Sequence, residues 1–162
     1  MVIRVARMEE LDTIMDLYDQ GRRFMRQSGN FGQWTGGYPQ RELIKADIRA
    51  GHCYLVLEGG EMAGVFCFLH GRDVEPAYAN IDGAWLDSGP YGVLHRVASN
   101  GRVKGLIAAC ADWCLAQCPS LRVDTYQDNR PMRRALERCG FQYCGTVVYA
   151  DEGERLAYQK LN

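Results

Sequence analysis

The stretch YGVLHRVASNGRVKG, residues 91–105, is the part of the sequence from which the fold can best be read. Its first nine residues are mostly apolar and predict a central strand, and residues 101–105 then open a helix that ends before Pro119. The first backbone amides of a helix have no partner within it, and the helix dipole adds positive charge at that end. Because glycine also lets the backbone approach a ligand closely, residues 99–105 predict a turn that binds a pyrophosphate.

Two better-known nucleotide-binding turns do not fit this stretch. It lacks the spacing of a P-loop, and it lacks the three glycines and the following acidic residue of the dinucleotide-binding fingerprint. Arg102 and Lys104 place side-chain charge beside Gly101 and Gly105, which favours the phosphate interpretation. A plain connection that contains glycine would show the same spacing, so both interpretations stand at this point.

Strand and helix patterns alternate on both sides of this stretch. Apolar spacing predicts strands at 2–7, 53–58, 62–70, 121–126, 143–149 and 155–160, and helices at 11–27, 40–50 and 131–139. A loop is predicted at 28–39, a hairpin turn at Gly59 and Gly60, and a second turn from Asp151 to Gly153. This order, βααββ followed by βαβαββ, predicts an α/β fold of the mixed α+β kind, with a mostly antiparallel mixed sheet of about seven strands and four helices on its two faces.

Composition limits the functions that are open to the chain. Its 162 residues, 47% of them hydrophobic, are enough for a single domain over residues 1–162. The 19 basic and 20 acidic residues nearly cancel, so we expect no broad surface for nucleic acid or membranes. No apolar run could cross a bilayer and no secretion signal opens the sequence, so we expect a cytoplasmic protein. The seven cysteines, among them Cys110, Cys114 and Cys118, predict reduced core thiols rather than a metal site, because structural zinc takes close pairs from turns.

Two motifs resemble those of a known family. Residues 94–98, Leu-His-Arg-Val-Ala, followed by Arg102-x-x-Gly105, resemble the central strand and pyrophosphate loop of the GNAT superfamily of acyl-CoA N-acyltransferases. Asn129 and the run Cys-Gly-Phe at 139–141 resemble that family's second signature. The resemblance covers essentially the whole chain. It implies a GNAT-like fold and an N-acetyltransferase that takes its acyl group from acetyl-CoA, with no metal.

The resemblance also implies which residues hold coenzyme A. In this family the central strand parts from its neighbour, and its free backbone groups pair with the pantetheine arm, a role that falls to Val97 and Ser99. Ile107 departs from the family pattern, which usually has Gly or Ala there, but its amide remains available. Asn129 also fits an ordinary helix N-cap. The implied cofactor-binding residues are Val97, Ser99, Arg102, Val103, Lys104, Gly105, Leu106, Ile107, Asn129, Met132 and Arg133.

Amine acylation needs a base for the amine and a donor for the developing oxyanion. His95 is our leading general base because it stands two residues before Val97 and should share one side of the strand with it. The amide near Val97 is the implied oxyanion donor. A histidine packed beside the sheet would fit the same pattern, and Asp82 and Asp124 are carboxylate alternatives for the base.

The reaction also needs a group that protonates the leaving thiolate. The family's usual general acid is a tyrosine in the last helix, where this chain has Leu136. Tyr126 is our first candidate for this catalytic role, with Tyr143 and Tyr149 as alternatives, and water could also supply the proton. A coenzyme A-binding sensor module that has lost turnover would fit the missing tyrosine as well.

The loop at 28–39 carries Trp34 and Tyr38, and it looks like the loop that closes the acceptor pocket in some bacterial members of the family. Aromatic rings there could bind an apolar or cationic amine, or they could only pack the loop against the core. We expect the acceptor to be a small-molecule amine, with a protein or peptide amine as the alternative. Pairing of the final strands between subunits would give a homodimer.

Overall fold

The computed structural model describes residues 1–150 and 152–162. Its helices are α1 (Leu11–Gln27), α2 (Arg41–Arg49), α3 (Leu106–Leu115) and α4 (Arg130–Arg138), with short 3-10 helices η1 (Met8–Glu10) and η2 (Pro76–Asn80). Its strands are β1 (Val2–Val5), β2 (Cys53–Glu58), β3 (Glu61–Gly71), β4 (Asp82–Gly83), β5 (Tyr91–Ser99), β6 (Ser120–Thr125), β7 (Gln142–Tyr149) and β8 (Gly153–Leu161). The predicted order of long strands and helices is confirmed. The predicted turn at 151–153 includes Asp151, which lies outside the described residues.

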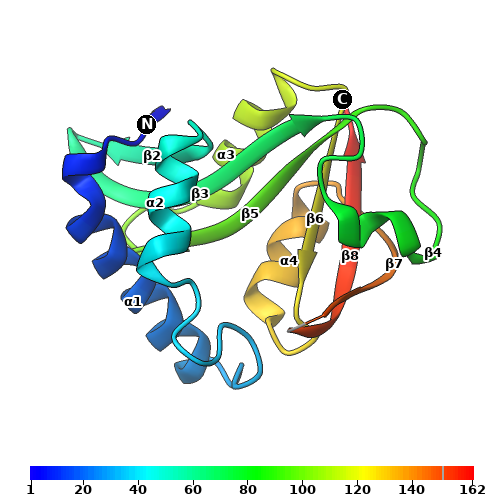
Figure 1. Cartoon of the computed structure of the whole chain (residues 1–162), viewed down its shortest axis with the longest axis horizontal. Coiled ribbons are helices and arrows are strands. Elements are labelled where there is room, and N and C mark those ends of the chain that lie inside the picture. Colours follow the sequence, from blue (N-terminus) through cyan, green and yellow to red (C-terminus); the bar gives the residue numbers. More distant parts are fainter. Residues whose placement is uncertain (151) are drawn as a thin grey trace.

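The strands form one mixed sheet of eight, in the order β1-β2-β3-β5-β6-β8-β7-β4 (Figure 1). All neighbouring pairs are antiparallel except β5 and β6, which run parallel. The mostly antiparallel mixed sheet was predicted, and the additional strand is β4, which pairs Asp82 with Thr146. A strand of two residues shows no apolar alternation, so the sequence pattern could not reveal it.

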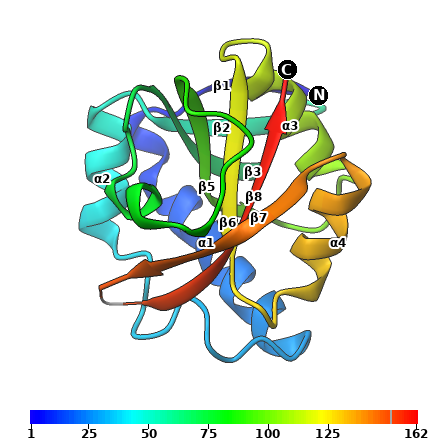
Figure 2. The ribbon, with the colours of Figure 1, turned by 90° about the vertical axis from the view of Figure 1, so that its right-hand side faces the viewer.

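Helices cover both faces of the sheet, as predicted (Figure 2). Helices α1 and α2 bury Ile14 and Ile44 against one face, and α3 and α4 bury Cys114 and Leu136 against the other. The three cysteines at 110, 114 and 118 are buried in the core on the α3 side, as expected for reduced thiols. None of the described helices combines the length and apolar character needed to span a membrane.

The two parallel strands separate in the middle of the sheet. The β5–β6 ladder contains only the pairs Gly92–Leu121 and Val93–Arg122. Beyond them the strands diverge, as Figure 1 shows, while β5 continues along β3. From Leu94 onward, the edge of β5 toward β6 therefore pairs with no strand in the described part of the chain.

A β-bulge interrupts β5 just after this separation. Pairing with β3 passes from Cys67–His95 to Val65–Ala98, so Arg96 and Val97 are both inserted opposite a single residue of β3. Arg96 has a φ of +48°, which is uncommon for a residue other than glycine. The bulge breaks the two-residue alternation, because Leu94 and Val97, three residues apart, both pack toward α3 and α4. The prediction that His95 and Val97 share one side of the strand is therefore wrong.

Candidate active site

The predicted pyrophosphate turn is an irregular segment between β5 and α3. Gly101 and Gly105 have φ angles of +76° and +71°. Apart from each glycine and its chain neighbours, no described residue places a heavy atom within 4 Å of where a Cβ would stand on either. Gly105 is the N-cap of α3, and the first intrahelical bond that reaches it is donated by the Ala109 amide. The helix begins later than predicted, and the amides of residues 106–108 have no partner within it.

This turn lines a groove of about 720 Å³ formed with α1, β5, α3 and α4. Several residues implied to hold coenzyme A line the groove, namely Val97, Ser99, Val103, Gly105, Leu106, Ile107, Asn129 and Met132. The open space above both turn glycines and the free amides of α3 provide a surface that a diphosphate fits. The geometry therefore suits the coenzyme that the sequence motifs imply.

The cations predicted beside the turn do not line the groove. The Arg102 side chain is 74% exposed, its guanidinium lies 3.4 Å from the Glu61 carboxylate, and Lys104 is exposed as well. Arg133 points elsewhere and donates a hydrogen bond of 3.0 Å to the Gln127 carbonyl. These three side chains, predicted to bind the cofactor, are absent from the groove lining among the described residues.

Two cationic side chains that were not predicted line the groove instead. Arg23 of α1 and Arg138 of α4 both line it, and neither forms an ion pair with any described residue. Nothing in the sequence motifs marked them, because they lie far along the chain from the glycine-rich turn. Only the packing of α1 and α4 brings Arg23 and Arg138 into the groove that the turn lines.

A second cavity, of about 260 Å³, adjoins the groove at the point where β5 and β6 separate. Met25, Val97, Asn129 and Met132 line both spaces. Trp34 and Tyr38, predicted to bind the acceptor, line the second cavity. A groove suited to a coenzyme thus opens beside Val97 into a smaller space with aromatic walls.

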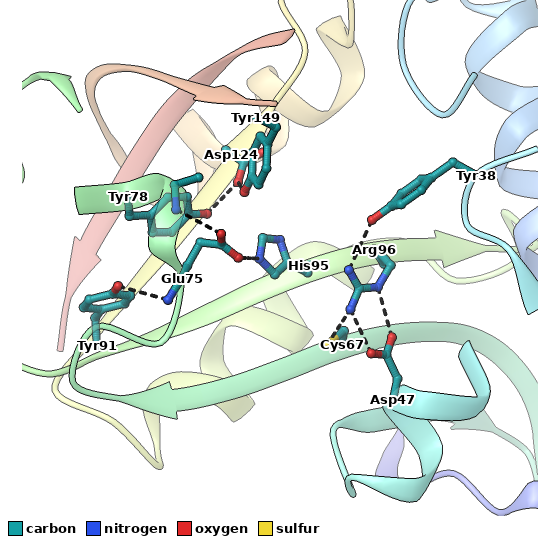
Figure 3. Close-up of polar contacts among 11 residues, drawn as sticks. Tyr38, Asp47, Cys67, Glu75, Tyr78, Tyr91, His95, Arg96, Asp124 and Tyr149 are labelled. Carbon is teal, nitrogen blue, oxygen red and sulfur yellow. Dashed lines mark hydrogen bonds and ion pairs between the residues drawn. The ribbon is translucent and has the colours of Figure 1, made fainter. Parts of the chain in front are cut away.

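His95 and Glu75 form a pair in this second cavity (Figure 3). His95 Nε2 lies 3.1 Å from Glu75 Oε2, and the two side chains are only 14% and 18% exposed. Burial pushes the pKa of Glu75 upward, but the hydrogen bond from His95 and its charge together hold that pKa below its ordinary value. The sequence analysis missed Glu75, since no motif or periodic pattern marks the segment before η2.

Asp124, a predicted alternative for the base, is held by two tyrosines. The hydroxyls of Tyr78 and Tyr149 donate to its Oδ2 at 2.6 and 2.7 Å. Burial and then the Asp124 charge raise the pKa of both tyrosines well above the ordinary value. Tyr149 lines the second cavity, but a hydroxyl already given to a carboxylate is a poor proton donor for a thiolate.

A buried ion pair holds the bulge in β5. The Arg96 guanidinium donates to both carboxylate oxygens of Asp47 on α2 at 2.9 and 3.0 Å. It also donates to Tyr38 Oη at 3.2 Å and to Cys67 Sγ at 3.3 Å, as Figure 3 shows. One side chain therefore ties the bulge to α2, to β3 and to the loop that borders the second cavity.

Asn129 connects the same loop to α4. Its Oδ1 accepts a hydrogen bond of 3.3 Å from the Met132 amide, which confirms the N-cap interpretation. Its Nδ2 donates at 3.0 Å to Gln33 Oε1, and Gln33 also accepts from Asn30 at 2.8 Å. The loop is thus anchored to the helix that forms one wall of the groove.

The remaining predicted residues lie outside both spaces. The Tyr126 ring packs at Gly32, where an added Cβ would stand 2.7 Å from it, and lies 5.1 Å from the Arg155 guanidinium. Tyr126 lines neither cavity among the described residues, so its position argues against the predicted role as general acid. Tyr143 is 57% exposed on β7, and Asp82 is exposed on β4 at the sheet edge.

Comparisons with known proteins agree with this geometry. Residues 11–141 match the acetyltransferase (GNAT) family. A GNAT-family acetyltransferase from Streptococcus agalactiae is 34% identical, with 99% of this chain and 95% of that chain covered and a TM-score of 0.89. A GNAT-family acetyltransferase from Bacillus cereus is 20% identical, with 99% and 96% covered and a TM-score of 0.64. Comparison with curated proteins gives no match.

A further structure of the same fold was solved with its ligands. It is an aminoglycoside acetyltransferase in complex with coenzyme A and kanamycin, 17% identical, with 99% of this chain and 94% of that chain covered and a TM-score of 0.66. The fold is that of a GNAT acetyltransferase. The chain belongs to the GNAT family of acetyltransferases, which confirms the resemblance seen in the sequence motifs.

Proposed function

We propose that this protein transfers an acetyl group from acetyl-CoA to a primary amine of a small molecule, by direct attack in a ternary complex. The observation that carries the proposal is the junction of the two spaces, since Val97 and Met132 line both the groove and the second cavity. A thioester that lies along the groove and an amine in the second cavity would meet there. Direct transfer then needs no covalent enzyme intermediate.

The groove supplies the binding groups that coenzyme A requires. The amides of residues 106–108 and the turn at Gly101 and Gly105 would hold the pyrophosphate. The unpaired edge of β5 beyond Val93 would pair with the pantetheine arm like an added strand. Arg23 and Arg138 would add positive charge toward the phosphates.

His95 and Val97 would carry the chemistry in this proposal. Nitrogen of the amine attacks the thioester carbon, so that a C–N bond forms and the C–S bond breaks. His95 takes one proton from an acceptor that arrives as an ammonium and returns it to solvent. The amide of Val97, which has no Cα partner on β3 or β6, would donate to the developing oxyanion. The second proton leaves the nitrogen as the amide forms and reaches the thiolate through water.

The lining of the second cavity supports a cationic amine as the acceptor. Glu75, Asp124 and Glu152 line it together with two arginines, and each arginine is already paired with a carboxylate, Arg96 with Asp47 and Arg155 with Glu152. Carboxylates and aromatic rings both favour an ammonium group. A space of about 260 Å³ also suits a small molecule better than a folded protein surface.

Calorimetry with coenzyme A and mass spectrometry after incubation with acetyl-CoA and a panel of amines would test the proposal. Gly105→Val is the informative variant, because its side chain would fill the open space at the turn and strain a φ of +71°. Gly51→Val is the matched control, since Gly51 has a φ of +74°, open space around it and no place in either cavity. We expect Gly105→Val alone to abolish coenzyme A binding. Absence of binding to the wild-type protein would overturn the proposal.

A further inference from the structure

We propose that Glu75 is a positioning residue that fixes the tautomer of His95 and thereby presents His95 Nδ1 as the base. The inference rests on the proposed function and deepens it, because it states how the base of that site is held. The two residues are 20 positions apart in the chain, and the turn of the chain before η2 brings them to 3.1 Å.

The Glu75 carboxylate has a fixed orientation. Its Oε1 accepts a hydrogen bond of 3.2 Å from the Ala77 amide at the start of η2. The Glu75 amide donates at 3.3 Å to the Tyr91 hydroxyl, which anchors the backbone from the other side. Oε2 is thereby directed at His95, and the contact does not depend on a freely rotating side chain.

The chemistry of the pair determines which ring nitrogen is protonated. An ionised carboxylate only accepts hydrogen bonds, so the proton of neutral His95 lies on Nε2, between the two residues. Nδ1 forms no hydrogen bond with any described residue, and it is not among the buried polar atoms without a partner, so water reaches it. Because His95 lines the second cavity, its free lone pair is available to an amine there.

Glu75 would also stabilise the product of proton transfer. When Nδ1 takes a proton from the acceptor ammonium, the imidazolium remains hydrogen-bonded to a carboxylate that is mostly shielded from water. Glu75 and His95 would thus act like the carboxylate and the histidine of a hydrolase triad, in which the carboxylate orients the histidine and the histidine moves the proton.

Other ionisable side chains face His95 from the elements around the cavity, namely Tyr78, Arg96, Asp124, Tyr149, Glu152 and Arg155. Arg96 is paired with Asp47, and both tyrosines give their hydroxyls to Asp124. Cys67 stands opposite His95 on β3, where burial raises its pKa to about 12 and keeps it neutral. Among the described residues, Glu75 alone forms a hydrogen bond with the His95 ring.

Glu75→Gln tests the inference because it keeps the size of the side chain. Its single amide oxygen can still accept from the Ala77 amide, but its NH2 group then faces His95 and cannot accept the Nε2 proton. We expect kcat to fall by about 100-fold, the usual contribution of a general base. The KM for acetyl-CoA should stay unchanged. In Glu75→Gln the midpoint of the rise of kcat/KM with pH should move to lower pH, because the imidazolium loses its counter-ion. Glu75→Asp keeps the carboxylate and should restore part of kcat.

A second measurement is independent of activity. Nitrogen NMR of the three histidine rings, with a His95→Asn variant for assignment, reports the tautomer of each. We expect the Nε2–H form of His95 in the wild-type protein and its loss in Glu75→Gln. Glu154→Gln, which removes an exposed carboxylate of β8 outside both cavities, should behave as the wild type in both experiments.

Two results would overturn the inference: an Nδ1–H tautomer in the wild-type protein, or a pH profile of Glu75→Gln that matches the wild type. If Glu75→Gln does not fold, the wild-type tautomer alone decides. If the wild-type protein neither binds coenzyme A nor acetylates any amine, the proposed function fails, and the tautomer still shows whether the Glu75–His95 contact forms.

Discussion

Replacing Asp47 by Ala should destabilise the protein strongly, because it leaves the Arg96 charge buried without its counter-ion. The two side chains are 10% and 14% exposed and share two hydrogen bonds of 2.9 and 3.0 Å. Removing one partner of a buried pair typically costs about 3–5 kcal/mol. Arg96 keeps two neutral acceptors, Tyr38 Oη and Cys67 Sγ, so we expect the low end, about 3 kcal/mol. Urea unfolding followed by circular dichroism measures this loss.

Asp12→Ala is the matched control. Asp12 also pairs with an arginine, Arg41, but these side chains are 85% and 50% exposed, so the loss should stay below about 1 kcal/mol. A double variant, Asp47→Leu with Arg96→Met, should recover much of the stability because it buries no charge. The acetylation rate should fall in Asp47→Ala and stay low in the double variant, since both release the bulge that positions Val97. An Asp47→Ala variant as stable as Asp12→Ala would refute this account of the ion pair.

Three further predictions concern stability and coenzyme binding. Thr125→Val should raise the free energy of unfolding by roughly 1 kcal/mol, because the buried Thr125 Oγ1 has no hydrogen-bond partner among the described residues. Urea unfolding measures this change, and a lower free energy of unfolding would contradict the prediction. Arg138→Gln should weaken coenzyme A binding by about 3-fold in calorimetry, whereas Arg133→Gln should leave it unchanged, since Arg133 lies outside the groove. Since the pKa of Glu75 is depressed, its contribution to stability is present above its ordinary value of 4.5 and is lost as pH falls through the lowered pKa. Urea unfolding at mildly and strongly acidic pH should therefore show a smaller loss in Glu75→Gln than in the wild type.

The sequence revealed the long elements because each has a regular apolar period. Helix α1 and strand β3 were predicted within about one residue of their bounds, since each buries one face or a continuous run. The turn between β5 and α3 could be predicted because Gly101 and Gly105 mark it, and glycine with a positive φ has few substitutes. The family motifs then implied the GNAT-like fold, which periodicity alone leaves open.

The details of the site could not be predicted in the same way. The inserted residue at Arg96 puts His95 and Val97 on different sides of β5, although the sequence predicted one shared side. Nothing in an apolar pattern marks such a bulge. Glu75 reaches His95 from a segment without periodicity, so the contact depends on the tertiary path of the chain. Arg102, adjacent in sequence to the turn, extends into solvent, while Arg23 arrives from α1.

The buried thiols have a practical consequence for measuring turnover. Burial raises the pKa of Cys53, Cys67 and Cys110 to about 12, so these groups carry no thiolate near neutral pH and react poorly with disulfide reagents. A chromogenic disulfide could therefore report each coenzyme A molecule as it is released, with little background from the enzyme interior. Cys139 is half-buried at the groove wall, so slower labelling of it in the presence of coenzyme A would report that the groove is filled.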